Sequence, residues 1–277
     1  MSSSRCSLML AAAVGLAVAG LATLSKAQSP STEPSLTEAQ QREFLLNAKI
    51  INYKQIGKGV TSPWRLTLSD GAVTHDAAFQ NVDLRQAEVA FRQGPSEIGF
   101  RDFYGYNIAA YELAKLLGLS DMVSVTVERR WKGQAGALSW WVPWKWDEEM
   151  RQKQNLQPPN AEAWNNQVDK VRVFVQLIYD TDRNAGNLLI AEDWKLWIID
   201  FTRAFRLHKT LRNPEQLQRC DRQLWENLHK LNAKELMEKT ASHLSKGEVQ
   251  ALLARRDAMV DYFQRLIQQK GESAVLY

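Results

Sequence analysis

Two carboxylates and one amide in a short part of this 277-residue chain have the spacing to hold a metal ion and to act on a hydroxyl group. Asn187 follows Asp182 by five residues, and Asp200 comes directly after the apolar run 197–199. Phosphoryl transfer needs a carboxylate at the acceptor hydroxyl and oxygen ligands for Mg²⁺ ions that bridge the phosphates. The pattern predicts that Asp182 orients or deprotonates an acceptor while Asn187 and Asp200 hold Mg²⁺.

Each of these residues could also have a purely structural role. Asp182 and Arg183 could form a surface ion pair, and Asn187 could cap a turn. Asp200 could cap the segment that follows it. Because all three polar groups fall in one loop and at the end of one strand, we favour the chemical interpretation, with Arg183 counted beside Asp182 in the catalytic group.

A β-rich first half and a helical second half must position these groups. Strand character over 49–83, with a turn signal at 69–71, predicts a β-hairpin. Apolar spacing then predicts a helix over 103–117 that ends at Gly118, strands over 122–130 and 137–142, a helix over 168–179, and strands over 188–190 and 196–199. The last 60 or so residues have helical periodicity. This order predicts an α+β fold with two lobes.

The run Asp-Arg-Asn-Ala-Gly-Asn-Leu-Leu-Ile at 182–190, followed by Ile-Ile-Asp-Phe at 198–201, resembles the catalytic and metal-binding loops of the atypical kinase-like superfamily. That superfamily includes the phosphatidylinositol 3/4-kinases, the HipA toxins and the Fam20 kinases of the secretory pathway. From about Ile56 onward the chain resembles a family of exported bacterial proteins with this pattern. The resemblance implies a two-lobed protein-kinase-like fold, with an N-lobe over 46–143 and a helical C-lobe over 144–277. It also implies Mg²⁺ and ATP as cofactors.

The same resemblance implies a nucleotide-binding set in the N-lobe, consisting of Gly57, Lys58, Gly59, Gln80, Asn107, Trp141 and Val142. Gln80 stands where these kinases have the lysine that holds the α- and β-phosphates, and Asn107 stands where they have its glutamate partner. Losing the lysine alone would leave a costly unpaired carboxylate, so we expect Gln80 and Asn107 to form a neutral amide pair instead. Lys58 would then supply the positive charge, as a lysine does in the with-no-lysine kinases.

Two of these N-lobe features also fit structures that bind no nucleotide. The two glycines beside Lys58 are equally typical of an ordinary turn. The run Trp-Trp-Val-Pro-Trp-Lys-Trp at 140–146 falls where the resemblance places the connection between the lobes, and there Trp141 and Val142 would line the adenine pocket. Tryptophan also stacks on sugar rings, so a glycan- or peptide-binding module stays open, as does a simple hydrophobic seam between lobes.

The N-terminal residues predict export. Arg5 precedes an apolar run over 8–24, and Ser25-Lys26-Ala27 has the small residues that a signal peptidase reads. We therefore expect a signal peptide over 1–27, a linker and short helix over 28–45, and a periplasmic or secreted location. An uncleaved membrane anchor is the alternative, and it would be the chain's only contact with a membrane.

The charge and cysteine content of the chain limit the kinds of partner that it can have. Two of the four net positive charges, Arg5 and Lys26, lie in the expected signal peptide, and no Lys/Arg run predicts a nucleic-acid partner. Only Cys220 is left after cleavage, which excludes a disulfide within the mature chain. Three hypotheses follow: an exported Mg²⁺-nucleotide-dependent phosphotransferase with an unknown protein, lipid or glycan acceptor; a pseudokinase scaffold that binds a nucleotide or a protein partner; and an envelope module that binds a glycan or peptide.

Overall fold

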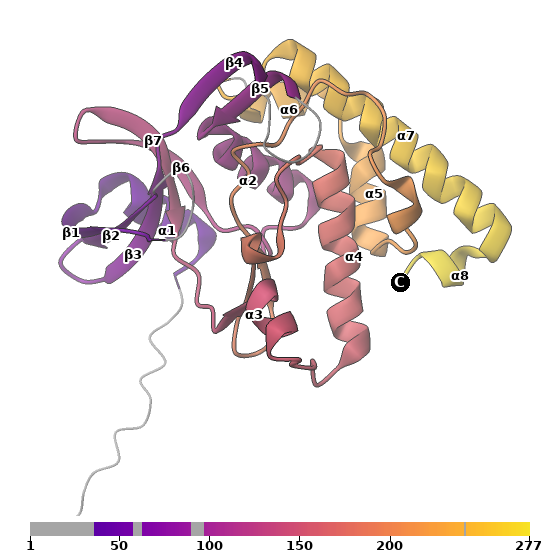
Figure 1. Ribbon diagram of the computed structural model, residues 1–277, viewed down its shortest axis with the longest axis horizontal. Coiled ribbons are helices and arrows are strands. Elements are labelled where there is room, and N and C mark those ends of the chain that lie inside the picture. The colour runs from indigo at the N-terminus through magenta and orange to yellow at the C-terminus, as the bar shows by residue number, and fades with distance from the viewer. Residues whose placement is uncertain (1–35, 58–62, 90–96, 241) are drawn as a thin grey trace, which may run out of the picture. The chain divides into compact units, whose positions relative to one another are not determined.

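The computed structural model of the protein describes residues 36–57, 63–89, 97–240 and 242–277 (Figure 1). The expected signal peptide over 1–27 lies outside the described residues, as do the first part of the linker and two members of the predicted nucleotide-binding set, Lys58 and Gly59. None of the helices in the described ranges combines the length and the apolar character that crossing a membrane requires.

A five-stranded antiparallel sheet dominates the first half of the described chain. Its strand order is β1-β2-β3-β7-β6. The bounds are Lys49–Gln55 for β1, Trp64–Ser69 for β2, Thr74–Gln80 for β3, Thr126–Trp131 for β6 and Gln134–Trp140 for β7. The predicted turn joins β2 to β3: Asp70 Oδ1 accepts the backbone N–H groups of Ala72 and Val73 at 2.9 and 2.8 Å, and Gly71 has φ of +95°.

Side chains alternate between the two faces of this sheet. Leu66 and Leu68 on β2, with Ala77 and Phe79 on β3, are at most 1% exposed and form part of the core. Two helices contact β6 and β7: α1, Glu38–Asn47, and α2, Gly105–Leu117. The opposite face has polar, partly exposed side chains, and it is the face that carries Gln80.

Helix α1 is the expected short helix, and it begins with a capping box formed by Thr37 and Gln40. Helix α2 ends as predicted, because Gly118 adopts φ of +74° and its N–H bonds to the carbonyl groups of Ala114 and Lys115. Its start differs from the prediction by two residues, since it begins at Gly105 and not at 103.

A two-stranded ribbon that the sequence did not predict precedes α2. Strand β4, Asp83–Val89, pairs with β5, Glu97–Phe103, in antiparallel register. Almost all of β4 is exposed, so it lacks the apolar alternation by which a strand is recognised in a sequence. The ribbon reaches the candidate site: the N–H of Phe103 donates to the carbonyl oxygen of Thr202 at 2.9 Å.

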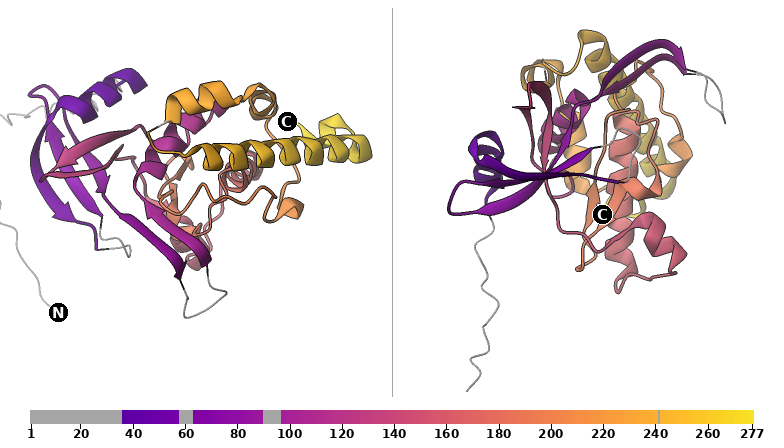
Figure 2. Two further views of the ribbon diagram at one scale, coloured as in Figure 1. Left: turned by 90° about the horizontal axis from the view of Figure 1, so that it is seen from above. Right: turned by 60° about the vertical axis from the view of Figure 1, so that its left-hand side comes forward.

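The second half of the chain is mostly helical (Figure 2). Its α-helices are α3 (Glu148–Lys153), α4 (Ala161–Leu177), α5 (Arg222–Lys230), α6 (Ala233–Thr240), α7 (Lys246–Lys270) and α8 (Glu272–Val275). Two single-turn 3-10 helices, η1 (Ala185–Asn187) and η2 (Pro214–Gln216), lie in its loops. A small antiparallel sheet, in the order β10-β9-β8, is formed by β8 (Trp146–Asp147), β9 (Leu188–Ile190) and β10 (Leu196–Ile198). This combination of a β-sheet lobe and a helical lobe is the predicted α+β, two-lobed architecture.

A buried arginine joins α7 to the loops beside the site. Arg255 is 0% exposed, and its guanidinium donates to the carbonyl groups of Leu177, at the end of α4, and of Arg206. Burial lowers the pKa of Arg255 to about 10, which still leaves it charged at neutral pH. Helix α7 therefore fixes both the end of α4 and the segment that follows Asp200.

Candidate functional site

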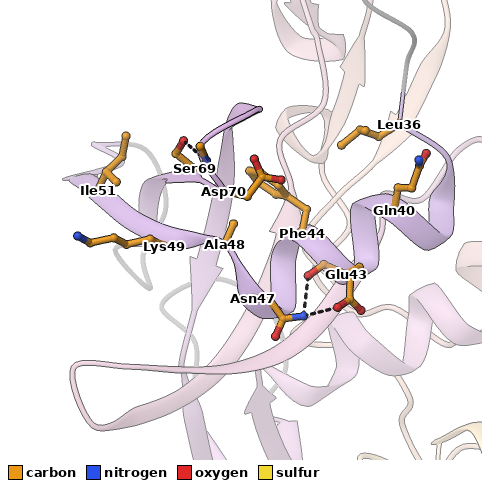
Figure 3. A pocket seen from close by; sticks show the side chains of 11 residues that line it. Leu36, Gln40, Glu43, Phe44, Asn47, Ala48, Lys49, Ile51, Ser69 and Asp70 are labelled. Carbon is orange, nitrogen blue, oxygen red and sulfur yellow. Dashed lines mark hydrogen bonds between the residues drawn. The ribbon is translucent and has the colours of Figure 1, made fainter.

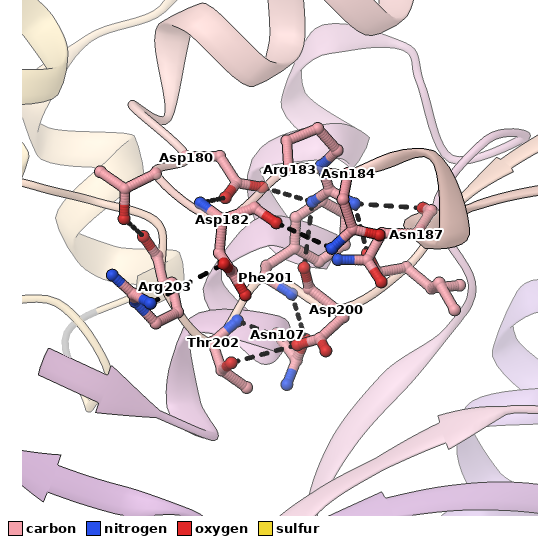
Figure 4. A network of polar contacts seen from close by, with 12 residues as sticks. Asn107, Asp180, Asp182, Arg183, Asn184, Asn187, Asp200, Phe201, Thr202 and Arg203 are labelled. Carbon is pink, nitrogen blue, oxygen red and sulfur yellow. Dashed lines mark hydrogen bonds and ion pairs between the residues drawn. The ribbon is translucent and has the colours of Figure 1, made fainter. Parts of the chain in front are cut away.

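The topology brings Asp182, Asn187 and Asp200 to the same end of the small sheet (Figure 4). Leu188 on β9 is paired with Ile198 on β10, so the residue before β9 and the residues after β10 are neighbours. The N–H of Ile199 donates to the carbonyl oxygen of Asn187 at 3.2 Å. The predicted catalytic and metal-binding loops thus lie side by side.

Arg183 holds these two loops together from inside the protein. Its guanidinium donates to the backbone carbonyl groups of Asn187 at 3.1 Å, of Ile199 at 2.5 Å and of Asp200 at 3.0 Å. Only 11% of its side chain is exposed. The sequence placed Arg183 in the catalytic group, but in the structure its two terminal nitrogens are used by the protein. Its place is that of a positioning residue.

Asp180 completes this arrangement, and sequence reasoning assigned it no role. Its carboxylate forms an ion pair with the Arg183 guanidinium and also accepts the N–H of Asp182 at 3.0 Å. The Asp180 side chain is 2% exposed. An acid three residues before an arginine is too common a pattern to identify such a pair, and only burial distinguishes it from a surface contact.

Asp182 lies at the open side of this network. Its side chain is 59% exposed, and one carboxylate oxygen is 3.8 Å from the Arg203 guanidinium. Partial removal from water raises the pKa of the Asp182 carboxyl, and the charges of Asp200 and Asp180 raise it further against the opposing effect of Arg203. A raised pKa makes the carboxylate a stronger base, which suits a group that accepts a proton from a hydroxyl.

Asp200 has a backbone conformation that few residues other than glycine adopt. Its φ is +58°, and its carboxylate accepts the hydroxyl of Thr202 at 3.1 Å. Aspartate and asparagine tolerate this left-handed region better than other side chains, and such a conformation persists only where surrounding contacts impose it. Here the contacts are the Arg183 bond to the Asp200 carbonyl and a bond from the Phe201 N–H to Asn107 Oδ1 at 2.8 Å.

The oxygen ligands offered by Asp200 and Asn187 fit Mg²⁺ better than a metal ion that is held entirely by protein side chains. Within the described ranges, no three or more His, Cys, Asp or Glu side chains converge as a metal site. Mg²⁺ is usually held by one or two carboxylates together with waters and substrate phosphates. Asp200 and Asn187, one carboxylate and one amide, are sufficient for that mode of binding.

Gln80 and Asn107 form the expected amide pair. Asn107 Nδ2 donates to Gln80 Oε1 at 3.0 Å, between the end of β3 and the first turn of α2. The orientation of the Asn107 amide is fixed because its oxygen must face the Phe201 N–H. The pair therefore connects the sheet, α2 and the segment after Asp200 without bringing a positive charge to the site.

The other described members of the predicted nucleotide-binding set lie on separate segments of the N-lobe. Gly57 is at a bend with open space where a side chain would be. Trp141 and Val142 follow β7 at the connection between the sheet and the helical half, and Val142 is 4% exposed. Glu112, an acid further along α2, is paired with Arg42 and Lys115.

A pocket of about 850 Å³ lies elsewhere, between α1, β1 and the β2–β3 turn (Figure 3). It is lined by residues such as Phe44, Ile51 and Asp70, and it includes none of the predicted site residues. Its position gives it no part in the chemistry of Asp182 and Asp200.

The fold has well-matched counterparts among solved structures. A hydra Fam20 structure with sugar aligns with a TM-score of 0.63 at 14% identity, covering 86% of this chain and 91% of that one. The Golgi casein kinase with Mn/ADP bound aligns at 0.59 and 12% identity, covering 86% and 78%. The Helicobacter pylori proinflammatory kinase CtkA aligns at 0.50 and 11% identity, covering 82% and 98%. No protein family model and no curated protein matches the sequence.

These likenesses show that the chain has a kinase-like fold, as the resemblance of its loops implied. At such low identities they concern the fold alone. The roles of the individual residues depend on the geometry of the site itself.

Proposed function

We propose that the protein is an exported phosphotransferase that uses a Mg²⁺-bound nucleotide, with ATP as the donor expected from the sequence. The observation that carries the proposal is the Asp180–Arg183 pair, which fixes both loops so that Asp182 stays open while Asn187 and Asp200 lie beside it. This buried network positions three exposed or half-exposed polar groups. Such an arrangement favours a functional site over a purely structural loop.

In this proposal, Asp182 accepts the proton of the acceptor hydroxyl, or orients that hydroxyl toward the phosphorus atom. Asp200 and Asn187 would hold Mg²⁺, which when bound would neutralise charge on the phosphates. Arg203, within 3.8 Å of Asp182, restrains that carboxylate and lowers its pKa in opposition to the neighbouring acids. The manganese and ADP bound by the Golgi casein kinase support a metal-nucleotide site in this fold.

The proposal is tested by measuring thermal stability of the chain with Mg²⁺-ATP, together with transfer of labelled phosphate. Nucleotide at about a hundred times its dissociation constant stabilises a protein by roughly 2.7 kcal/mol. Asp200→Asn should remove this Mg²⁺-dependent gain. Asp182→Asn should keep the gain but lose at least about a hundredfold in transfer rate, as expected for loss of a general base. Asp261→Asn, an exposed change on α7, is the matched control. Stabilisation that survives Asp200→Asn unchanged would contradict the proposed metal site.

A second candidate function, a pseudokinase, is favoured by the Gln80–Asn107 pair. This pair holds α2 against the sheet but offers no cation to the phosphates. A pseudokinase would bind the nucleotide, or a protein partner, with no transfer above the rate in the absence of enzyme. Mg²⁺-nucleotide stabilisation together with equal, background-level transfer in the natural chain and Asp182→Asn would select this second function.

Export and the acceptor also belong to the proposal. The apolar run over 8–24 and the small residues after it support a periplasmic or secreted location. The sugar in the hydra Fam20 structure makes glycans reasonable first acceptors to try, with secreted proteins next. Fractionation of cells that express the tagged full chain would test the location, and retention in the cytoplasm would contradict it.

A further inference from the structure

An arginine lies on the polar face of the sheet, close to the connection between the two halves of the chain. Arg65 on β2 is paired in register with Ala78 on β3, and it therefore shares a face with Asp76 and Gln80. Its Cζ lies 4.2 Å from the centroid of the Trp141 ring. The sheet face that carries Gln80, the predicted phosphate-contacting position, thus also has an arginine–tryptophan stack, and its arginine is paired with a residue two positions before Gln80.

The Arg65 guanidinium is held in a defined orientation. Its Nε donates to Asp76 Oδ2 at 2.6 Å, and one terminal nitrogen contacts the same oxygen. Trp141 is itself fixed, since its N–H donates to the Asp76 carbonyl at 3.1 Å and its carbonyl oxygen is 3.0 Å from His75 Nε2. Arg65 is therefore held by more than an ion pair: Asp76 binds its guanidinium, and Trp141, whose backbone N–H and carbonyl are both hydrogen-bonded, stacks against it.

Asp76 uses the Nε side of the guanidinium, so the end-on edge formed by the two terminal nitrogens points away from this contact. The Arg65 side chain is 32% exposed, so part of it is open to solvent. Two parallel N–H donors in one plane match two adjacent acceptors in a planar ligand. Guanine presents such a pair, O6 and N7, whereas adenine presents an amino donor beside N7.

The position along the sheet agrees with a nucleotide whose phosphates lie at the metal ligands. Gln80 is bonded to Asn107, and Asn107 to the Phe201 N–H beside Asp200. The Arg65 backbone is paired with Ala78, but its guanidinium contacts Asp76, which is four residues from Gln80 on β3 and so roughly 13 Å away along the strand. That separation leaves room for a ribose and phosphates between a base at Arg65 and a metal ion at Asp200.

We infer that Arg65, oriented by Asp76 and stacked on Trp141, determines the base specificity of the nucleotide and selects guanine over adenine. The inference rests on the proposed nucleotide site and replaces ATP, the donor expected from the sequence, with nucleotides that have a 6-oxo purine. Trp141 holds the guanidinium by stacking on it, and Arg65 contributes the distinction between bases.

Calorimetric titration of the chain with Mg²⁺ and GTP, ATP, inosine triphosphate or 7-deaza-GTP tests the inference. GTP should bind about 5- to 20-fold more tightly than ATP, the lower part of the range for a bidentate arginine–guanine contact because the arginine is partly exposed. Inosine triphosphate keeps O6 and N7 and should bind like GTP. 7-Deaza-GTP lacks N7 and should lose most of the advantage.

Variants separate this specificity from binding as such. Arg65→Met should equalise GTP and ATP, and Asp76→Asn should reduce the preference by releasing the guanidinium. Arg85→Met, at an exposed arginine on the ribbon, should leave it intact. Arg65→Lys, which keeps the charge but not the two parallel donors, should also lose the preference and guards against misfolding of the methionine variant. ATP binding as tightly as GTP, or a preference that survives Arg65→Lys, would overturn the inference and leave the proposed function standing. Absence of binding by every nucleotide would overturn both.

Discussion

The two ends of the candidate site hold their polar groups by different means. At the loop end, a buried ion pair between Asp180 and Arg183 fixes the backbone around Asp182 and Asp200, and the groups it presents are acids. At the sheet end, Gln80 and Asn107 are joined by a neutral hydrogen bond. The groups proposed to bind metal and to accept a proton thus have a rigid, charged support, while an amide stands where the resemblance implied a cation at the sheet.

This difference shows that the mechanical support of a site and its contact with phosphates can vary separately. The amide pair links the same elements that an ion pair would link, since it connects β3 to α2 and, through Asn107, to Phe201. It avoids the desolvation cost of burying two charges, but it gives up the electrostatic contact with a nucleotide. Breaking each support in turn should therefore have unequal effects.

The largest effect is expected at the loop end. Arg183→Met leaves the Asp180 carboxylate buried without its partner, so we expect the free energy of unfolding to fall by about 3–5 kcal/mol. Urea unfolding measures this change. Lys153→Met, which breaks an exposed pair with Glu149 on α3, should cost no more than about 0.5 kcal/mol.

A second substitution distinguishes the charge from the packing. Asp180→Asn combined with Arg183→Met removes the unpaired charge and should recover part of the lost stability. A loss below about 1 kcal/mol for Arg183→Met alone would mean that the two loops are held by other contacts, and the contrast between the two ends would disappear.

At the sheet end, restoring the charges should show what the amide pair replaced. Asn107→Glu alone puts a carboxylate at a 4% exposed position and moves the acceptor of the Phe201 N–H one carbon further along the side chain, so a loss of about 3 kcal/mol is expected. Adding Gln80→Lys should recover about 1–3 kcal/mol as a coupling energy in a double-mutant cycle.

The same double variant bears on the nucleotide. A lysine at position 80 adds a charge-assisted contact to the phosphates, and affinity for Mg²⁺-nucleotide should rise at least about tenfold. If the double variant folds, recovers the coupling energy and yet binds the nucleotide no better than the natural chain, the sheet end does not face the phosphates.

A smaller effect concerns the pH dependence of Asp182. Its pKa is raised, chiefly by partial removal from water, and the carboxylate must be ionised to accept a proton. The transfer rate should therefore increase with pH through this raised pKa and level off above it. Arg203 lowers that pKa, so Arg203→Met should move the inflection of the pH–rate profile to higher pH. An inflection that moves to lower pH would show that another group is being titrated.

Some parts of this picture followed from the sequence and others did not, for physical reasons. Strands and helices with clear apolar periodicity, such as α2, were predicted within a few residues. The Gln80–Asn107 contact was predicted because Gln80 in place of the lysine and Asn107 in place of the glutamate compensate each other. Ribbon β4–β5 was missed because its exposed side chains leave no periodic signal.

The roles within the loop were harder to predict. Burial decides whether an aspartate–arginine pair is a surface contact or an internal support, and the burial of Asp180 and Arg183 depends on the surrounding helices. No pattern in the sequence places Arg65 over Trp141 either, since the two residues are 76 positions apart and meet only through the sheet register.

The smallest expected effect comes from the ribbon, where Asp102 is buried close to the acids of the loop end. Burial raises its pKa, and the charges of Asp200 and Asp182 act in the same direction. Because the folded-state pKa is above the unfolded one, the neutral carboxyl favours the fold at low pH, and this stability is lost as pH rises through the folded pKa. Asp102→Asn should therefore match the natural chain near pH 3, become more stable than it as the pH rises through the folded pKa of Asp102, and keep a constant advantage above that pKa, as measured by thermal unfolding.

The same variant connects stability to the chemistry of the loop end. The charge of Asp182 raises the pKa of Asp102, and repulsion between two carboxylates is reciprocal. Removing the Asp102 charge should therefore lower the pKa of Asp182 and move the pH–rate inflection to lower pH, opposite to Arg203→Met. Asp83→Asn, at an exposed position on the same ribbon, should change neither quantity. If Asp102→Asn alters stability without moving the inflection, the ribbon supports the loop end mechanically and has no electrostatic share in its pH dependence.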